Sequence, residues 1–287
     1  MSSSRRGLFR AAAEAAARAA AADPAAREPA PPPDPEPLLG DQEVERYSRQ
    51  LVMEGWGEAE QVALRDASVL VIGAGALGSP VASYLAGAGV GRLGIVDDDL
   101  VELSNLHRQF LHFTPDLGQP KAHTAVAKLQ FLNPEIAVEP YQVRLDEANA
   151  DGLVAGHDLV VDCSDGFATR YAVNAACCRA GVALVEGGVV GLTGLVMSIE
   201  PGDSACYRCA FPEPPPPGAV PTCAQAGVLG PAAGVIGSLQ ALEALKLLAG
   251  MPGAVTDAFL QVDLARGEVL TVRTARRADC PDCGGLR

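Results

Sequence analysis

A glycine-rich turn, GAGALG at residues 73–78, limits the folds open to this chain more than any other feature. It follows a β-branched run at 68–72 that predicts a strand, and it precedes Pro80, whose favourable first-turn position predicts a helix. The turn has the pattern G-x-G-x-x-G, with glycine at Gly73, Gly75 and Gly78. Such a turn lets a phosphate approach the free N–H groups of the helix N-terminus, so it predicts nucleotide binding. Glycines kept only for helix–sheet packing are the alternative.

Strand and helix patterns alternate through the rest of the chain. Further strands are expected at 93–96, 136–143, 158–162 and 182–185, and helices at 121–132, 146–155, 168–180 and 235–249. This alternation predicts an α/β fold, a Rossmann-like, doubly wound, mostly parallel sheet. Three later strand patterns are hairpin-like and predict antiparallel C-terminal strands, at 195–200, 258–264 and 268–272.

Composition and charge exclude several classes of function. Of 287 residues, 48% are hydrophobic and 20% charged, which is typical of a soluble globular protein. The net charge of −13 argues against nucleic acid or an anionic membrane as a partner, because both attract a basic surface. Charged residues and helix breakers interrupt the longest apolar region, from Ala226 onward, so no membrane span is predicted. We expect a cytoplasmic protein.

Residues 1–40 differ from the rest of the chain. An alanine-rich stretch at 8–22 is followed by a proline-rich one, a combination that predicts a solvated, disordered tail. An export signal or an organellar transit peptide is the alternative, although Glu14 and Arg18 interrupt the apolar run that an export signal needs. We expect one folded domain over residues 41–287.

Charged and amide side chains follow the second predicted strand. Asp97 ends that strand, where an acid can bond ribose hydroxyls, and up to this point an NAD-dependent oxidoreductase is the favoured function. Asn105, Arg108 and Lys121 come next. Two cations and an amide near the phosphates suit attack on the α-phosphate of ATP better than hydride transfer, because that attack builds negative charge on the phosphates.

Two aspartates, Asp162 and Asp165, stand at the end of a later predicted strand. Their spacing places one carboxylate within reach of a magnesium ion. Together with the two cations, they favour adenylyl transfer over surface ion pairs of no catalytic use.

Several segments of the chain together closely resemble the ThiF/MoeB/HesA family, the bacterial relatives of ubiquitin-activating enzymes. They are RYSRQ at 46–50, GAGALG at 73–78, SNLHRQ at 104–109, Lys121, DCSD at 162–165 and two C-x-x-C pairs. The resemblance covers residues 41–284. It implies a homodimer that uses ATP and Mg²⁺ to adenylate the C-terminal Gly-Gly carboxylate of a ubiquitin-like sulfur-carrier protein. The carrier would be of the molybdopterin-synthase small-subunit type or the ThiS type.

The resemblance also implies residue roles. Asp97 would hold the ribose, and Arg108 and Lys121 would contact the phosphates with Asn105 beside them. Asp165 would be the magnesium-linked acid.

A further implied role crosses between subunits, because Arg49 would reach the phosphates from the other copy of the chain. This sequence departs from the family pattern at two positions. Gly166 stands where asparagine is common, and His107 where glutamine is usual. With Gly166 the carboxylate of Asp165 is still present, but the residue that follows it, and with it the local positioning of that carboxylate, differs from the family pattern.

The two C-x-x-C pairs, Cys206/Cys209 and Cys280/Cys283, predict a structural zinc site of four thiolates. Two disulfides are the alternative. A proline-rich stretch between the pairs leads to Cys223, which is expected in a lid over the carrier tail. By the resemblance, Cys223 either joins the activated carrier or is dispensable.

We expect sulfur to reach the carrier from a separate persulfide donor. Three other functions remain open at the level of sequence. They are an ATP-dependent tRNA-base dehydratase of the same superfamily, an NAD-dependent oxidoreductase, and a catalytically silent, zinc-stabilised interaction protein.

Overall fold

The computed structural model of this chain describes residues 38–216 and 226–286, which fall in one compact unit beginning at Leu38. Eight strands are present in these residues: β1 (Ser68–Ile72), β2 (Arg92–Val96), β3 (Ala137–Tyr141), β4 (Leu159–Asp162), β5 (Ala183–Val190), β6 (Thr193–Ile199), β7 (Ala258–Asp263) and β8 (Glu268–Arg273). The helices are α2 (Asp41–Arg46), α3 (Glu58–Asp66), α4 (Gly78–Ala88), α5 (Lys121–Leu132), α6 (Ala150–Val154), α7 (Phe167–Ala180), α8 (Tyr207–Ala210) and α10 (Gly230–Leu248).

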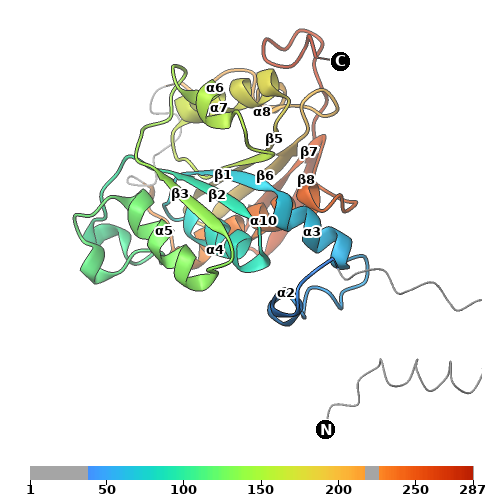
Figure 1. Ribbon diagram of the computed structural model, residues 1–287. Helices are drawn as coiled ribbons and strands as arrows, with labels where there is room; N and C mark the ends of the chain where they lie inside the picture. The colour runs from blue at the N-terminus through green and yellow to red at the C-terminus, as the bar shows by residue number, and fades with distance from the viewer. Residues whose placement is uncertain (1–37, 217–225, 287) are drawn as a thin grey trace, which may run out of the picture. The chain divides into compact units, whose positions relative to one another are not determined.

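The strands form a single sheet in the order β3-β2-β1-β4-β5-β6-β7-β8 (Figure 1). Neighbouring strands are parallel from β3 to β5, and β6, β7 and β8 then add antiparallel pairs. The predicted mostly parallel sheet with antiparallel C-terminal strands is confirmed.

Helices cover both faces of the sheet. One core is formed where α4, α5 and α10 pack on the sheet, and α6, α7 and α8 lie on the other face (Figure 1). Because successive side chains of a strand point to opposite faces, Val69 and Val71 enter the first core while Leu70 and Ile72 enter the second. All five residues of β1 are buried, and the four that follow Ser68 are apolar, as is typical of a strand covered on both faces.

The strand order reverses beside β1. From β1 the chain proceeds through α4 to β2 on one side, and it later returns to place β4 on the other side of β1. In open α/β sheets the crevice at such a switch point, outside the carboxyl ends of the strands, is where ligands bind. The segments that follow β1, β2 and β4 meet at this edge.

Three element boundaries differ from the sequence prediction by four residues or more. β5 runs to Val190 because its second half pairs with β6 in the antiparallel part of the sheet. Helix α10 begins at Gly230, with Pro231 in its first turn, five residues earlier than the apolar periodicity indicated. Helix α6 is only 5 residues long, since Asp146 and Asn149 form a turn before it.

Only residues 38–40 of the expected tail are described, and Leu39 among them is buried. Helix α2 follows directly at Asp41. In the part of the chain that the structure describes, no helix is both long enough and apolar enough to cross a membrane.

Candidate active site

The glycine-rich turn connects β1 to α4 at the carboxyl edge of the sheet. Gly73 has a φ of 93°, and a Cβ there would lie 3.0 Å from the carbonyl oxygen of Cys163 in the loop after β4. A Cβ on Gly78 would lie 1.8 Å from the carbonyl oxygen of Gly73. A side chain therefore fits at neither position, and the turn packs directly against the loop that carries Asp165.

The peptide of Ala74, within this turn, is held from both sides. Its N–H donates to Asp97 Oδ2 at 2.8 Å, and its carbonyl oxygen lies 2.9 Å from His112 Nε2. Asp97 Oδ1 accepts the N–H of Asp99 at 2.9 Å. Each carboxylate oxygen of Asp97 keeps a second lone pair that can accept a ribose hydroxyl. Burial raises the pKa of Asp97, while the nearby charge of Lys121 opposes that rise.

His112 links the turn to the helix that begins at Lys121. Its Nδ1 lies 2.8 Å from Thr124 Oγ1, on the first turn of α5. Because a carbonyl oxygen only accepts, Nε2 carries a proton that it donates to Ala74. In the neutral ring Nδ1 accepts from the Thr124 hydroxyl, whose other acceptor is the carbonyl oxygen of Lys121 at 3.1 Å. Burial lowers the pKa of His112, and this neutral tautomer suits that shift. Sequence reasoning gave His112 no role, since its spacing matches no metal or catalytic pattern.

Lys121 is buried at the start of α5, with its side chain 6% exposed. Its ammonium contacts Asp99 Oδ2 at 2.7 Å, and Asp99 itself is mostly exposed. This ion pair places a desolvated cation beside the glycine-rich turn. Sequence analysis identified Lys121 but not its partner Asp99, because nothing in the sequence distinguishes which of the three consecutive aspartates after β2 would pair with it.

Asn105 ends the 3₁₀ turn Leu103–Asn105, and Arg108 lies in the loop that follows it. Arg108 Nη1 donates to the carbonyl oxygen of Ser104 at 2.8 Å and lies 2.8 Å from His107 Nε2. Asn105 is buried, and its Oδ1 accepts the N–H of Glu102 at 3.1 Å. Gly230, at the start of α10, packs against His107 and Arg108.

The two aspartates after β4 occupy different environments. Asp162 is fully buried, and its Oδ1 accepts the N–H of Ser164 at 2.8 Å. Asp165 is exposed and makes no hydrogen bond or ion pair with a described residue that would engage its carboxylate. Of the pair, Asp165 is therefore the acid available to a ligand at this edge.

Arg49 lies away from the residues described so far. Its neighbour Tyr47 accepts a hydrogen bond from Asn133, which directly follows α5. Gln50 donates to the carbonyl oxygen of Ala88, the last residue of α4. Both helices begin at the carboxyl edge and run about 17 Å to the opposite edge, at 1.5 Å per residue. Arg49 is exposed there, so the fold does not bring it to the glycine-rich turn of its own chain.

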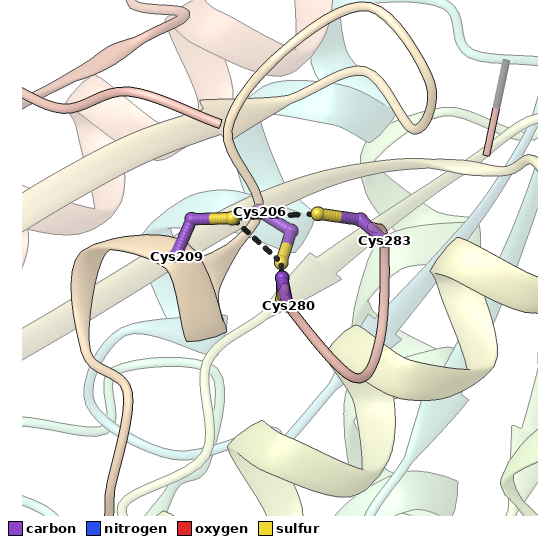
Figure 2. Close-up of side chains that lie close together, drawn as sticks. All are labelled: Cys206, Cys209, Cys280 and Cys283. Atoms are coloured by element: carbon purple, nitrogen blue, oxygen red, sulfur yellow. Dashed lines mark hydrogen bonds between the residues drawn. The ribbon is translucent and has the colours of Figure 1, made fainter. Parts of the chain in front are cut away.

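Four cysteine thiols meet on the α7 side of the sheet (Figure 2). Cys206 and Cys209 come from the start of α8, and Cys280 and Cys283 from the C-terminal turn. Sulfur–sulfur distances are 3.8 Å for Cys206 to Cys209, 3.6 Å for Cys206 to Cys280 and 3.3 Å for Cys209 to Cys283.

These distances decide between the two predicted uses of the cysteines. A tetrahedron with Zn–S bonds of 2.3 Å has edges of about 3.8 Å, close to the observed separations, whereas a disulfide has a bond near 2.0 Å. All four cysteines are buried, and none of them forms a disulfide bond. The donor set and its closure fit zinc without an open position for water.

Cys223 lies outside the described residues. The other three cysteines are buried, and burial raises the pKa of Cys163 and Cys177. They act as small apolar side chains in the core.

An apolar groove of about 540 Å³ opens between α4 and α10. Its lining includes Tyr84, Phe110, Val235 and Leu242, each more than two-fifths exposed. Phe110 belongs to the same loop as Arg108, so the groove adjoins the candidate site.

The ThiF family model matches residues 47–283. The sulfur carrier protein adenylyltransferase of Thermus thermophilus is 47% identical over 248 residues, which cover 85% of this chain and 92% of that protein. The SAMP-activating enzyme E1 of Haloferax volcanii is 46% identical, over 86% of this chain and 91% of that protein. The adenylyltransferase and sulfurtransferase MOCS3 of Sus scrofa is 46% identical, over 88% of this chain and 56% of that protein.

Solved structures share the fold. E. coli MccB with ATP has a TM-score of 0.76 and 22% identity, over 88% of this chain and 77% of that chain. PaaA has a TM-score of 0.70 and 20% identity, over 96% of this chain and 84% of that chain.

Proposed function

Because this chain belongs to the ThiF family, as its motifs predicted, we propose that it uses ATP to adenylate a ubiquitin-like sulfur-carrier protein. The acceptor is the C-terminal Gly-Gly carboxylate of that carrier. Two relatives named for this kind of activation match more than nine-tenths of their own length.

One observation carries the proposal. The edge of the sheet brings the glycine-rich turn, the buried cation of Lys121 and the free carboxylate of Asp165 to the same switch point. The N–H groups in the second half of the glycine-rich turn, where α4 begins, and the ammonium of Lys121 attract phosphates. An acid that has no partner in the described part of the chain stands across the turn from them, which suits a nucleotide accompanied by a divalent cation.

The reaction follows from these charges. The carrier carboxylate is already ionised at neutral pH, so it attacks the α-phosphorus of ATP without a general base. The bond from the α-phosphorus to the bridging oxygen breaks, leaving an acyl-adenylate and pyrophosphate. Lys121 and Arg108 neutralise charge that builds on the phosphates, and Asp97 orients the ribose. The protein contributes position and electrostatic stabilisation rather than a covalent step.

Mg²⁺ would be held through Asp165, and when bound it shields the phosphate charges. A carboxylate that is exposed at the mouth of the site offers the oxygen ligand that Mg²⁺ prefers. Asp162 does not compete for the ion, because it is buried and committed to Ser164.

The active unit is a homodimer in which Arg49 of one copy completes the site of the other. Arg49 is at the wrong edge to serve its own site, and it is exposed without an ion pair to any described residue. The apolar groove beside Arg108 provides a surface for a second copy to cover.

Mixing Arg49→Ala with Asp165→Asn tests this arrangement. Random exchange of subunits should restore about a quarter of wild-type activity, because half the dimers then hold one intact site. No recovery after verified subunit exchange would place Arg49 outside the catalytic machinery.

Zinc at the four cysteines ties the C-terminal turn to α8 and is structural, since the four thiolates close the coordination shell. A separate persulfide donor would then attack the acyl carbon through its terminal sulfur and displace AMP, giving an acyl disulfide between the carrier and the donor cysteine. A second thiol cleaves that S–S bond, which releases the carrier thiocarboxylate and leaves the thiol joined to the donor cysteine as a disulfide.

ATP–pyrophosphate exchange tests the adenylation step directly. It is measured with Mg²⁺ and a panel of Gly-Gly-ended carriers, including the molybdopterin-synthase and thiamine types. Exchange should require one carrier and disappear in Asp165→Asn, while Asp146→Asn, a surface acid in a turn before α6, serves as the matched control. If no carrier supports exchange and NAD rather than ATP raises the melting temperature, the adenylation proposal is wrong. ATP turnover that depends on tRNA instead would identify the dehydratase.

A further inference from the structure

A buried cluster of charged groups lies directly behind the loop that carries Asp165. Arg170, on the first half of α7, is 6% exposed, and its guanidinium pairs with Glu186 of β5, which is fully buried. The other terminal nitrogen of Arg170 donates to the carbonyl oxygen of Ser164 at 2.7 Å. One guanidinium thus joins a strand to the loop that precedes Asp165.

The cluster includes a second carboxyl group. Asp162 and Glu186 are register partners on the parallel strands β4 and β5, so their side chains leave the sheet on the same face. Asp162 Oδ2 and Glu186 Oε2 are both buried, and as carboxylate oxygens neither has a donor among the described residues. A proton on Glu186 satisfies both atoms, because its O–H then donates to Asp162.

Charge and burial favour that proton. Burial raises the pKa of Glu186 well above its ordinary value, the charge of Asp162 raises it further, and Arg170 lowers it. With one proton on Glu186, the two carboxyl groups and the guanidinium carry no net charge. A neutral, fully bonded cluster is the arrangement that a buried site tolerates.

The backbone of Ser164 is held at both of its polar groups. Its N–H donates to Asp162 Oδ1, and its carbonyl oxygen accepts from Arg170. Asp165 follows immediately, with an exposed side chain that no described residue restrains. Its direction therefore depends on the Ser164 peptide, which packs with Cys163 against the glycine-rich turn.

We propose that Arg170 and Glu186 are positioning residues that aim Asp165 at the nucleotide, with Glu186 holding Arg170 and Arg170 holding Ser164. Neither residue touches the substrate. This inference rests on the proposed function, since it concerns the acid used in adenylation.

Two substitutions separate positioning from packing. Arg170→Lys keeps the positive charge next to Glu186 but removes the planar fork that reaches Ser164 at the same time. Glu186→Gln keeps the shape of the side chain, accepts from Arg170 through its amide oxygen and donates to Asp162 through its amide nitrogen. Glu243→Gln is the control, because Glu243 is a buried carboxylate on α10 that bonds Ser198 and Val255 and pairs with Lys246 instead.

Each variant is measured for thermal unfolding, for kcat and KM in pyrophosphate exchange over a series of Mg²⁺ concentrations, and for hydrogen exchange at the Ser164 amide. Arg170→Lys should lower kcat by about 10- to 100-fold, the cost of misplacing a reacting group by about 1 Å, with the carrier KM unchanged. It should also speed exchange at the Ser164 amide by about tenfold, which requires only that the loop open more often. Glu186→Gln and Glu243→Gln should stay within about twofold of wild type in both readouts. The first keeps its hydrogen bonds to Arg170 and Asp162, and the second loses a pair with Lys246 but bonds none of the groups that hold Ser164.

Three results would overturn the inference. One is an Arg170→Lys variant whose Ser164 amide keeps wild-type protection. Another is Glu186→Gln with losses as large as those of Arg170→Lys, which would remove Glu186 from the chain of contacts. The third is a kcat loss in Glu243→Gln equal to that in Arg170→Lys, which would mark the effect as one of stability. If the wild-type protein shows no exchange with any carrier, the proposed function fails, while hydrogen exchange at Ser164 still decides whether Arg170 and Glu186 hold the loop.

Discussion

Gly78→Ala should disable nucleotide binding in a protein that still folds. The added Cβ would lie 1.8 Å from the carbonyl oxygen of Gly73 and 2.8 Å from its carbon, both backbone atoms that cannot swing aside. Ordinary contact needs 3.4 Å or more, so the first turn of α4 must move by about 1.6 Å relative to the turn. Overpacking of this kind costs about 1–3 kcal/mol.

The consequences for stability and for binding have different sizes. In a domain of this length, about 1–3 kcal/mol lowers the melting temperature by roughly 2–12 °C. A displacement of more than about 1 Å at the N–H groups that receive the phosphates should weaken ATP binding about 100-fold or more. Gly87→Ala is the matched control, because it makes the same substitution in the same helix where a Cβ meets nothing within 4 Å.

The assay is calorimetric titration of ATP into each variant, together with denaturant unfolding. Gly87→Ala should bind ATP like the wild type and gain up to about 1 kcal/mol of stability from better helix propensity. Wild-type ATP affinity in Gly78→Ala would show that the α4 N-terminus does not receive the phosphates, and the nucleotide site would then have to lie elsewhere.

Three more outcomes follow from the geometry. Burial lowers the pKa of His112, so the stability that the neutral ring contributes is present above about pH 6.5 and is lost as the pH falls through the folded-state pKa. His112→Gln should therefore reduce the dependence of the unfolding free energy on pH, measured by urea unfolding from pH 8 to 5. An unchanged pH dependence would contradict the neutral tautomer. Elemental analysis should find one zinc per chain, and chelation should lower the melting temperature before it weakens ATP binding; metal-free protein from a reduced preparation would contradict the four-thiolate site. Gly166→Asn should add only a few tenths of a kcal/mol by capping α7 and leave pyrophosphate exchange unchanged, since a Cβ there meets only Thr169 Oγ1 at 3.7 Å; a large gain in exchange would show that glycine misplaces Asp165.

Much of the fold could be predicted because its signals are local. The turn at 73–78 shows itself in glycines that no other residue can replace at Gly73 and Gly78, and helix α5 begins and ends at the predicted residues. Where prediction was wrong by several residues, a distant partner had extended or shortened the element, as β6 does for the second half of β5. Local periodicity contains no information about such a partner.

The site divides in the same way. The sequence alone determined which residue types were present: a glycine-rich turn, two cations, a pair of aspartates and four thiols with metal-ligand spacing. Only the tertiary structure decided that Asp165 is exposed while Asp162 is buried, and that Lys121 pairs with Asp99. It also placed Arg49 at the far edge of the sheet.

The physical reason is that a side chain's role depends on its partners. Glu186 lies 24 residues from Asp162 in the chain, yet strand register places the two side by side, and that neighbour raises the pKa of Glu186. His112 meets Ala74 only because α5 and α4 pack on the same face of the sheet. Short-range sterics write turns and helices into the sequence, whereas strand order and register, which bring remote residues into contact, exist only once the chain has folded.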